Sequence, residues 1–206
     1  MARASARGPR RRIAAHGIRM GGLMDTNVED LEQTSLTLPD GTVVVARLIQ
    51  PDDMRALQRF HTRLSQRSIY LRFFGVVPVL SDERARYFTH LDGQDRFAYV
   101  ALDPNDPDEI IGVVRMDREP GTDCGEYAVI VEDRWQGRGL GFALTRLLIA
   151  GARRRGYRTM YAMVLPENVR MLNLLRDLGL PARVRWVDGM ERVEVDISVP
   201  ERPSLA

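Results

Sequence analysis

Lysine is absent from this chain of 206 residues, in which all 30 basic residues are arginine. A Walker-type nucleotide loop ends in Gly-Lys-Ser/Thr, so the absence excludes that class of phosphate site. Cysteine occurs once, at Cys124, which excludes an intrachain disulfide framework and is typical of a reducing cytosol. We interpret this thiol as a bystander rather than a reactive group. No apolar run approaches the roughly 18 residues of a membrane-spanning helix, so we expect a cytoplasmic protein without a membrane span.

Histidine is also scarce, and this bears on metal binding. The three histidines, His16, His61 and His90, lack the short, regular spacing that metal ligands show in sequence-recognisable sites. Only one cysteine is available to join them. We therefore expect no metal site.

Acidic residues are missing from the first 23 residues, which carry six arginines. The rest of the chain has 24 arginines against 28 acids, a formal charge of −4. This mildly acidic core gives no reason to expect that it binds nucleic acid. We interpret the basic arm as a disordered extension, or as translated sequence upstream of a start at Met20 or Met24. The alternatives are a targeting segment or a contact with nucleic acid or anionic lipid.

The hydrophobic periodicity predicts one mixed α/β domain at 40–198, after a disordered or loosely packed extension at 1–39 and before a tail at 199–206. Two further patterns are specific: Asp188-Gly189 is a strong hairpin signal, and Pro51 opens a helix. Together the elements predict a mixed sheet with helices on both faces. Strands are expected at 43–48, 97–102, 110–116, 125–131, 158–165, 183–187 and 191–197, and helices at 51–64, 81–89, 139–155 and 167–178.

The most informative segment is Gln136-Gly137-Arg138-Gly139-Leu140-Gly141, which joins an expected strand to an expected helix. The first N–H groups of a helix lack internal partners and attract anions, and glycine lets a phosphate approach the backbone closely. A dinucleotide-binding loop needs Gly-x-Gly-x-x-Gly, which this spacing does not match. The alternative is a tight turn that uses glycines for packing alone.

The pattern Gln/Arg-x-x-Gly-x-Gly/Ala and the order of the expected elements resemble the GNAT family of acetyl-CoA-dependent N-acetyltransferases. Three segments, Arg47–Asp53, Leu64–Phe74 and Trp135–Gly141, look like bacterial protein lysine acetyltransferases that act on acyl-CoA synthetases. The resemblance implies a mostly antiparallel sheet that splays between 125–131 and 160–165, where the pantetheine arm of acetyl-CoA lies. It also implies a set of cofactor-binding residues: Val129, Ile130, Val131, Gln136, Gly137, Arg138, Gly139, Leu140, Gly141, Phe142 and Asn168.

The same resemblance implies that Glu126 is the general base. A glutamate on this strand takes a proton from the attacking amine directly or through one water. The other family position for a base is occupied by Met163, and the family's general-acid tyrosine is replaced by Leu175. A solvated acid on an exposed strand face is the alternative reading of Glu126, and a simple helix cap is the alternative reading of Asn168.

Three functions follow from this interpretation. The first is acetylation of protein lysines, with an acyl-CoA synthetase as an example of the acceptor. The second is acetylation of a small amine or an N-terminus. The third is a non-catalytic module that binds CoA as a sensor. The sequence does not indicate an oligomeric state.

Overall fold

The computed structural model describes residues 32–199, so the basic arm and residues 200–206 lie outside the described part of the chain. The strands are β1 (Gln33–Thr37), β2 (Val43–Leu48), β3 (Arg96–Asp103), β4 (Asp106–Arg118), β5 (Cys124–Val131), β6 (Thr159–Val164), β7 (Ala182–Val187) and β8 (Met190–Asp196). The helices are α2 (Met54–Thr62), α3 (Gln66–Phe73), α4 (Asp82–Thr89), α5 (Leu140–Arg154) and α6 (Val169–Asp177), with 3-10 turns η1 (Pro51–Asp53) and η2 (Asp133–Trp135).

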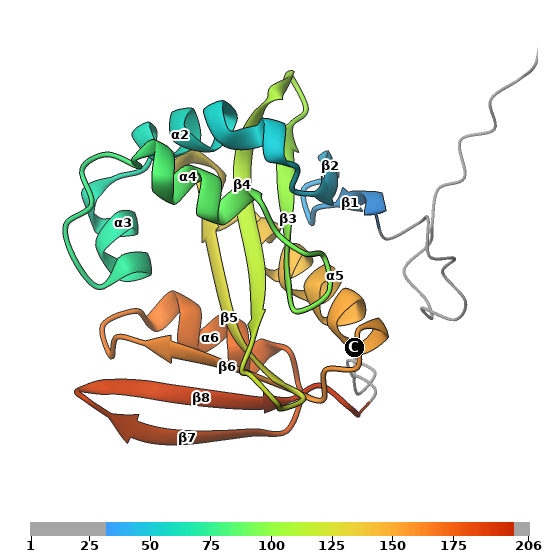
Figure 1. Ribbon diagram of the computed structural model, residues 1–206, viewed down its shortest axis with the longest axis vertical. Helices are drawn as coiled ribbons and strands as arrows, with labels where there is room; N and C mark the ends of the chain where they lie inside the picture. Colours follow the sequence, from blue (N-terminus) through green and yellow to red (C-terminus); the bar gives the residue numbers. More distant parts are fainter. Residues whose placement is uncertain (1–31, 200–206) are drawn as a thin grey trace, which may run out of the picture.

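The strands form one eight-stranded sheet in the order β1-β2-β3-β4-β5-β6-β8-β7 (Figure 1). Every neighbouring pair is antiparallel except β5 and β6, which run parallel. The predicted mixed, mostly antiparallel sheet is therefore confirmed. The predicted hairpin is also present, since Asp188 and Gly189 adopt φ of 50° and 78° and join β7 to β8.

Helices cover both faces of the sheet, as predicted. α5 and α6 pack on one face, where Leu140, Leu144 and Leu148 recur at helical spacing and are fully buried. α2, α3 and α4 pack on the other face around a second core. β5 contributes to both cores because its side chains alternate: Val129 and Val131 belong to the α5 side and Ile130 to the α2 side.

The start of the folded domain was predicted too late. Gln33–Thr37 pairs with β2 as an edge strand, and Leu38 is 2% exposed, so residues 33–39 belong to the domain. The strand carries only one large apolar residue, Leu36, because an edge strand buries little of its surface. Hydrophobic periodicity is weak in such a strand, which is why the sequence did not reveal it.

Helix α3 is a second element that the sequence did not predict. Its aromatic and β-branched residues are poor helix formers, and from the sequence the segment is only too apolar for an ordinary surface loop. Tertiary packing overrides this preference, since Ile69 is buried in the α2–α4 core and Phe73 packs against it. Ser65 caps the helix by accepting a hydrogen bond from the Ser68 backbone N–H at 3.1 Å.

The sheet opens between β5 and β6. The two strands pair only where Cys124–Glu126 lies beside Thr159–Tyr161. Beyond Glu126 and Tyr161 they diverge, as Figure 1 shows, while β6 stays paired with β8 along its full length. The splay implied by the family resemblance is thus a feature of this sheet.

Candidate active site

The glycine loop between η2 and α5 presents a row of free backbone donors. Gly137 and Gly139 adopt φ of 75° and 86°, which non-glycine residues rarely do, and Gly139 is the N-cap of α5. Within residues 32–199, the backbone N–H groups of Gly137 to Phe142 make no hydrogen bond of ordinary length and angle. The dipole of a 15-residue helix points at the same spot. The loop is therefore arranged to bind an anion.

Two side chains of the predicted cofactor-binding set make contacts within the protein. The Gln136 amide donates to the Val131 carbonyl at 2.9 Å and to the Ser68 hydroxyl at 3.0 Å, and it accepts from Arg170 at 2.6 Å. It thereby ties the loop to the end of β5. The backbone N–H groups of the loop itself stay free.

Arg138 is the second of these side chains. It forms an ion pair with Asp40 at 2.7 Å and lies 4.2 Å above the Trp135 ring. Hydrogen bonds from Thr42, then from Arg138, lower the pKa of Asp40 to about 2, so this pair is ionised at neutral pH. The β1–β2 turn is thus held against the loop, where a Cβ on Gly139 would lie 2.7 Å from Pro39 Cδ.

Along β5, the backbone N–H and C=O groups of successive residues point alternately toward β4 and toward β6. The Glu132 N–H donates to the Ile111 carbonyl at 2.9 Å, which fixes the alternation of the antiparallel β4–β5 ladder. By that alternation the backbone groups of Ile130 point to β4, and those of Tyr127, Val129 and Val131 point to the side of β6. The Val131 carbonyl accepts from Gln136, and its N–H remains on the open edge. The Ile130 backbone is therefore turned away from the gap, and its side chain lines a cavity under α2 and α3.

Glu126 lies at the apex of the opening. It is exposed, sits opposite Asp117 on β4 and Tyr161 on β6, and belongs to the last residue pair before the strands separate. Its side chain shares a sheet face with Ala128 and Ile130, the face covered by α2, α3 and α4. The sequence could not decide which face of β5 carries Glu126, and the structure places it on the α2–α4 face, at a point where the residue is exposed.

The remaining residues singled out in the sequence have structural roles. Leu175 is 3% exposed in the core. Tyr127 is 2% exposed, and its hydroxyl shares a hydrogen bond of 2.5 Å with the Thr145 hydroxyl. Burial raises the pKa of Tyr127.

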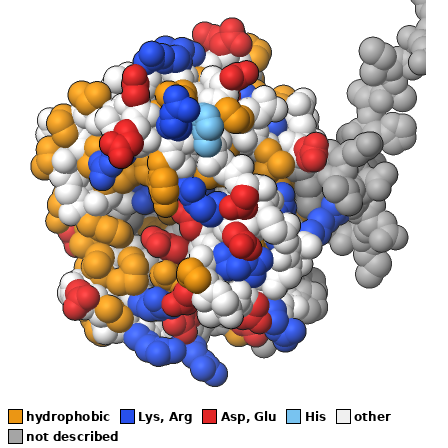
Figure 2. All heavy atoms as spheres, viewed as in Figure 1, with side chains coloured by type: hydrophobic (Ala, Val, Ile, Leu, Met, Phe, Trp, Pro, Cys, Tyr) orange, Lys and Arg blue, Asp and Glu red, His pale blue; other side chains and the backbone are white. Residues whose placement is uncertain are grey.

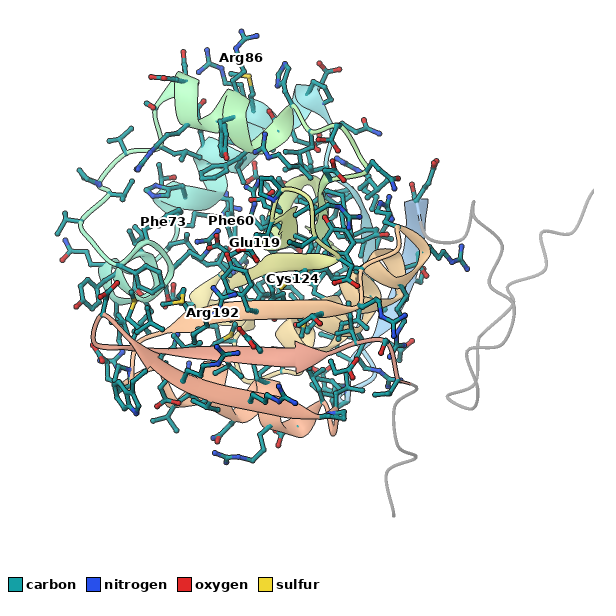
Figure 3. All side chains as sticks on the ribbon, turned by 60° about the horizontal axis from the view of Figure 1, so that its bottom comes forward. Phe60, Phe73, Arg86, Glu119, Cys124 and Arg192 are labelled. Carbon is teal, nitrogen blue, oxygen red and sulfur yellow. The ribbon has the colours of Figure 1, made fainter. Side chains whose placement is uncertain are left out.

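The half-buried Cys124 thiol stays protonated, because burial, then the charge of Glu119, raises its pKa. Figure 3 shows Cys124 near Glu119 and Arg192. Within residues 32–199, no group of His, Cys, Asp and Glu side chains is placed to hold a metal ion.

Asn168 caps α6, since its side-chain oxygen accepts from the Met171 backbone N–H at 3.3 Å. We predict that Asn168→Ala lowers the free energy of unfolding by about 1 kcal/mol. Asn168→Asp should restore stability, because aspartate caps equally well, yet lower the affinity for CoA if the side-chain NH2 group binds the cofactor. Urea unfolding and calorimetry measure the two effects separately, and equal CoA affinity in all three proteins would leave Asn168 as a cap alone.

Several residues that shape the site gave no signal in the sequence. Asp133 accepts hydrogen bonds from the Ser65 and Ser68 hydroxyls at 2.7 and 2.9 Å and so joins η2 to α3. Partial burial opposes ionisation of Asp133, but a hydrogen bond from the Ser65 backbone N–H at 2.9 Å and the two hydroxyl bonds outweigh it and lower the pKa. The partners are far apart along the chain, so no local pattern marks them.

Comparisons with known proteins agree with this geometry. The sequence profile of the Acetyltransferase (GNAT) family matches residues 63–180, which include the glycine loop and Glu126. The chain belongs to the GNAT acetyltransferase family. An acetyltransferase of Pseudomonas aeruginosa is 33% identical to this GNAT chain over 144 residues, which cover 69% of this chain and 77% of that protein.

Two further relatives of this GNAT enzyme carry the name Pat. Acetyltransferase Pat of Mycolicibacterium smegmatis is 31% identical over 170 residues, and the match covers 77% of this chain but only 48% of Pat. The chain thus spans about half the length of that relative. The crystal structure of the GNAT domain of S. lividans PAT superposes with a TM-score of 0.76 at 34% identity, covering 84% of this chain and 99% of that domain. No helix within residues 32–199 has the length and apolar character needed to cross a membrane.

Proposed function

We propose that this GNAT enzyme transfers the acetyl group of acetyl-CoA to the side-chain amine of lysine in a protein acceptor, with Glu126 as the general base. The observation that carries the proposal is one run of chain with unpaired backbone groups. It starts at the free amides of Gly137 to Phe142, follows the open edge of β5, and ends at Glu126. Each part of this run suits one part of the donor or the reaction.

The donor is assigned along β5. The amides of the loop would bind the CoA pyrophosphate, and the open edge at Tyr127, Val129 and Val131 would pair with the pantetheine arm as an added strand would. From Val131 to Glu126 the strand rises by ~17 Å at about 3.3 Å per residue. An extended pantetheine arm spans such a distance, so the thioester would lie at the apex beside Glu126.

The chemistry at the apex is a direct transfer. A backbone N–H of the open edge donates to the thioester carbonyl as negative charge develops on its oxygen. Glu126 takes a proton from the lysine ammonium, whose pKa is about 10.4 in free lysine, so that the neutral amine attacks. The N–C bond forms and the C–S bond breaks. Leu175 cannot donate a proton, so the thiolate leaves as such or takes a proton from water.

Exposed apolar side chains on two elements support a protein acceptor over a small amine. Tyr70 and Phe74 of the α3 region are 43% and 40% exposed, and Val184 and Trp186 of β7 are 55% and 67% exposed. Figure 2 shows hydrophobic side chains gathered on the side of the molecule between α3 and the β7–β8 hairpin. Exposed apolar patches of this kind mark protein contacts. The two relatives named Pat point the same way.

The test is release of CoA thiol from acetyl-CoA with three classes of acceptor. We expect release with an acyl-CoA synthetase as the acceptor, and acetyl-lysine on that protein by mass spectrometry. Release only with small amines would replace the protein acceptor by a small-molecule one. Tight binding of CoA without release for any acceptor would instead support a sensor.

Because the chain contains no lysine, the enzyme cannot contribute acetyl-lysine to the assay. The enzyme incubated with acetyl-CoA alone should give no acetyl-lysine signal on its own band, because it has no lysine to modify. An antibody against acetyl-lysine measures this. Any signal in a complete reaction then belongs to the acceptor, and a signal on the enzyme band alone would reveal a contaminating protein.

A further inference from the structure

A small cavity lies between the sheet and helices α2, α3 and α4, on the face that carries Glu126. Its volume is about 40 Å³, and its wall is largely apolar. Figure 3 shows Phe60 and Phe73, which reach the cavity from α2 and α3. Ala128 and Ile130 form its floor, and Glu126 follows them on the same face, ~7 Å along the strand from Ala128. The cavity is therefore adjacent to the proposed transfer centre.

Arg72 brings an unmatched positive charge to this cavity. Its guanidinium lies 5.0 Å from the Phe73 ring centroid and makes no hydrogen bond or ion pair with any other residue of 32–199. Burial, then repulsion by Arg115, lowers its pKa to about 10, so it is still charged at neutral pH. Arg72 is half-buried, and its guanidinium carries five N–H donors that a ligand entering the cavity could use.

The neighbouring charges do not neutralise it. Arg115 is 6% exposed and shares Asp117 with Arg96, at 3.2 and 3.4 Å. Asp117 is thus already divided between two arginines. Glu126 attracts Arg72 without a hydrogen bond between them, and by the proposed mechanism its charge serves the acceptor amine. This group contains three arginines (Arg72, Arg96 and Arg115) and two carboxylates (Asp117 and Glu126), so it has a surplus of one positive charge.

His61 adds a donor at the same place. It is 3% exposed, lines the cavity, and has no hydrogen-bond partner for either ring nitrogen within the described residues. Burial, then the charge of Arg84, lowers its pKa, so the ring is neutral and carries one N–H. The cavity therefore offers donors to a ligand and almost no acceptors.

We propose that Arg72, together with Arg115 and His61, forms a carboxylate-binding subsite beside the transfer centre. The carboxylate would come from one of two sources: the far end of an acyl group on CoA, or an acidic residue next to the acceptor lysine. The inference rests on the proposed function, because it takes Glu126 as the position of the transfer. A bidentate pair between guanidinium and carboxylate satisfies the donors and the surplus charge together.

The experiment measures kcat/KM in two arms. In the first, succinyl-CoA is compared with butyryl-CoA as the donor, with one lysine peptide as the acceptor. In the second, acetyl-CoA is the donor and a peptide with Glu beside its lysine is compared with the same peptide carrying Gln. We expect the carboxylate-bearing partner to be preferred at least about tenfold in one arm, and the arm identifies the source.

The variants show whether Arg72 causes the preference. Arg72→Met should abolish it while leaving the rates with the neutral partners within about twofold, and Arg72→Gln provides a second variant should the first not fold. Arg67→Met is the matched control, because Arg67 lies on the same helix and is exposed. The preference should persist in that variant.

Two outcomes would overturn the subsite. One is the lack of a preference in both arms of the wild-type enzyme. The other is an equal loss for charged and neutral partners in Arg72→Met, which would assign Arg72 to positioning Glu126. If acetyl is transferred to the Glu and Gln peptides at equal rates, the subsite is refuted and the proposed function stands. If acetyl is transferred neither to these peptides nor to a protein acceptor, the proposed function and the subsite are both refuted.

Discussion

Gly139→Asp should reduce the affinity for CoA at least about 100-fold. The new carboxylate would lie at the N-cap of α5, where the free amides and the helix dipole attract an anion, and would compete with the pyrophosphate for the same donors. The side chain would also approach Pro39, since even a Cβ lies 2.7 Å from its Cδ. Isothermal calorimetry with CoA measures the effect.

Gly139→Asn is the matched variant, because it has the shape of aspartate without its charge and tolerates positive φ better than most residues. Its loss of affinity reports the steric part alone, and the difference between the two variants reports the charge. Gly156→Asp adds the same strain, at φ of 80°, at the opposite end of α5. It should bind CoA normally. Micromolar binding retained by Gly139→Asp would show that the pyrophosphate lies elsewhere.

Glu126→Gln should lower kcat by about 10²–10⁴-fold with little change in CoA affinity. Glutamine keeps the size of the side chain and its place opposite Tyr161, but it cannot accept the proton of the ammonium. The variant should recover relative to wild type as the pH approaches the lysine pKa of about 10.4, because the acceptor then deprotonates in solution. Initial rates of thiol release from pH 6 to pH 9 measure both effects.

The control for this substitution is Glu119→Gln. Glu119 is exposed in the turn between β4 and β5, near Cys124 in Figure 3, and the same chemical change there removes a charge without touching the apex. Its pH profile should match wild type. If Glu126→Gln also keeps wild-type rates across this range, Glu126 is a solvated surface acid and the base lies elsewhere.

The sequence was sufficient where the structure depends on neighbours along the chain. The glycine loop, the helix after it and the hairpin at Asp188-Gly189 follow from positive φ, helical spacing and turn chemistry, which involve residues a few positions apart. The same holds for Asn168 as a cap. The sequence did not predict β1, because an edge strand buries little apolar surface, or α3, because packing overrode its weak helix preference.

The sequence by itself determined that a strand, a glycine turn and a helix would present free amides, and that an acid would stand on the strand before them. Only the tertiary structure decided which edge of β5 is open, which face Glu126 occupies, and that Arg72 meets a cavity. It also paired Arg138 with Asp40, 98 residues earlier. The physical reason is that these choices depend on strand register and on charge pairs between distant segments, which no local pattern encodes.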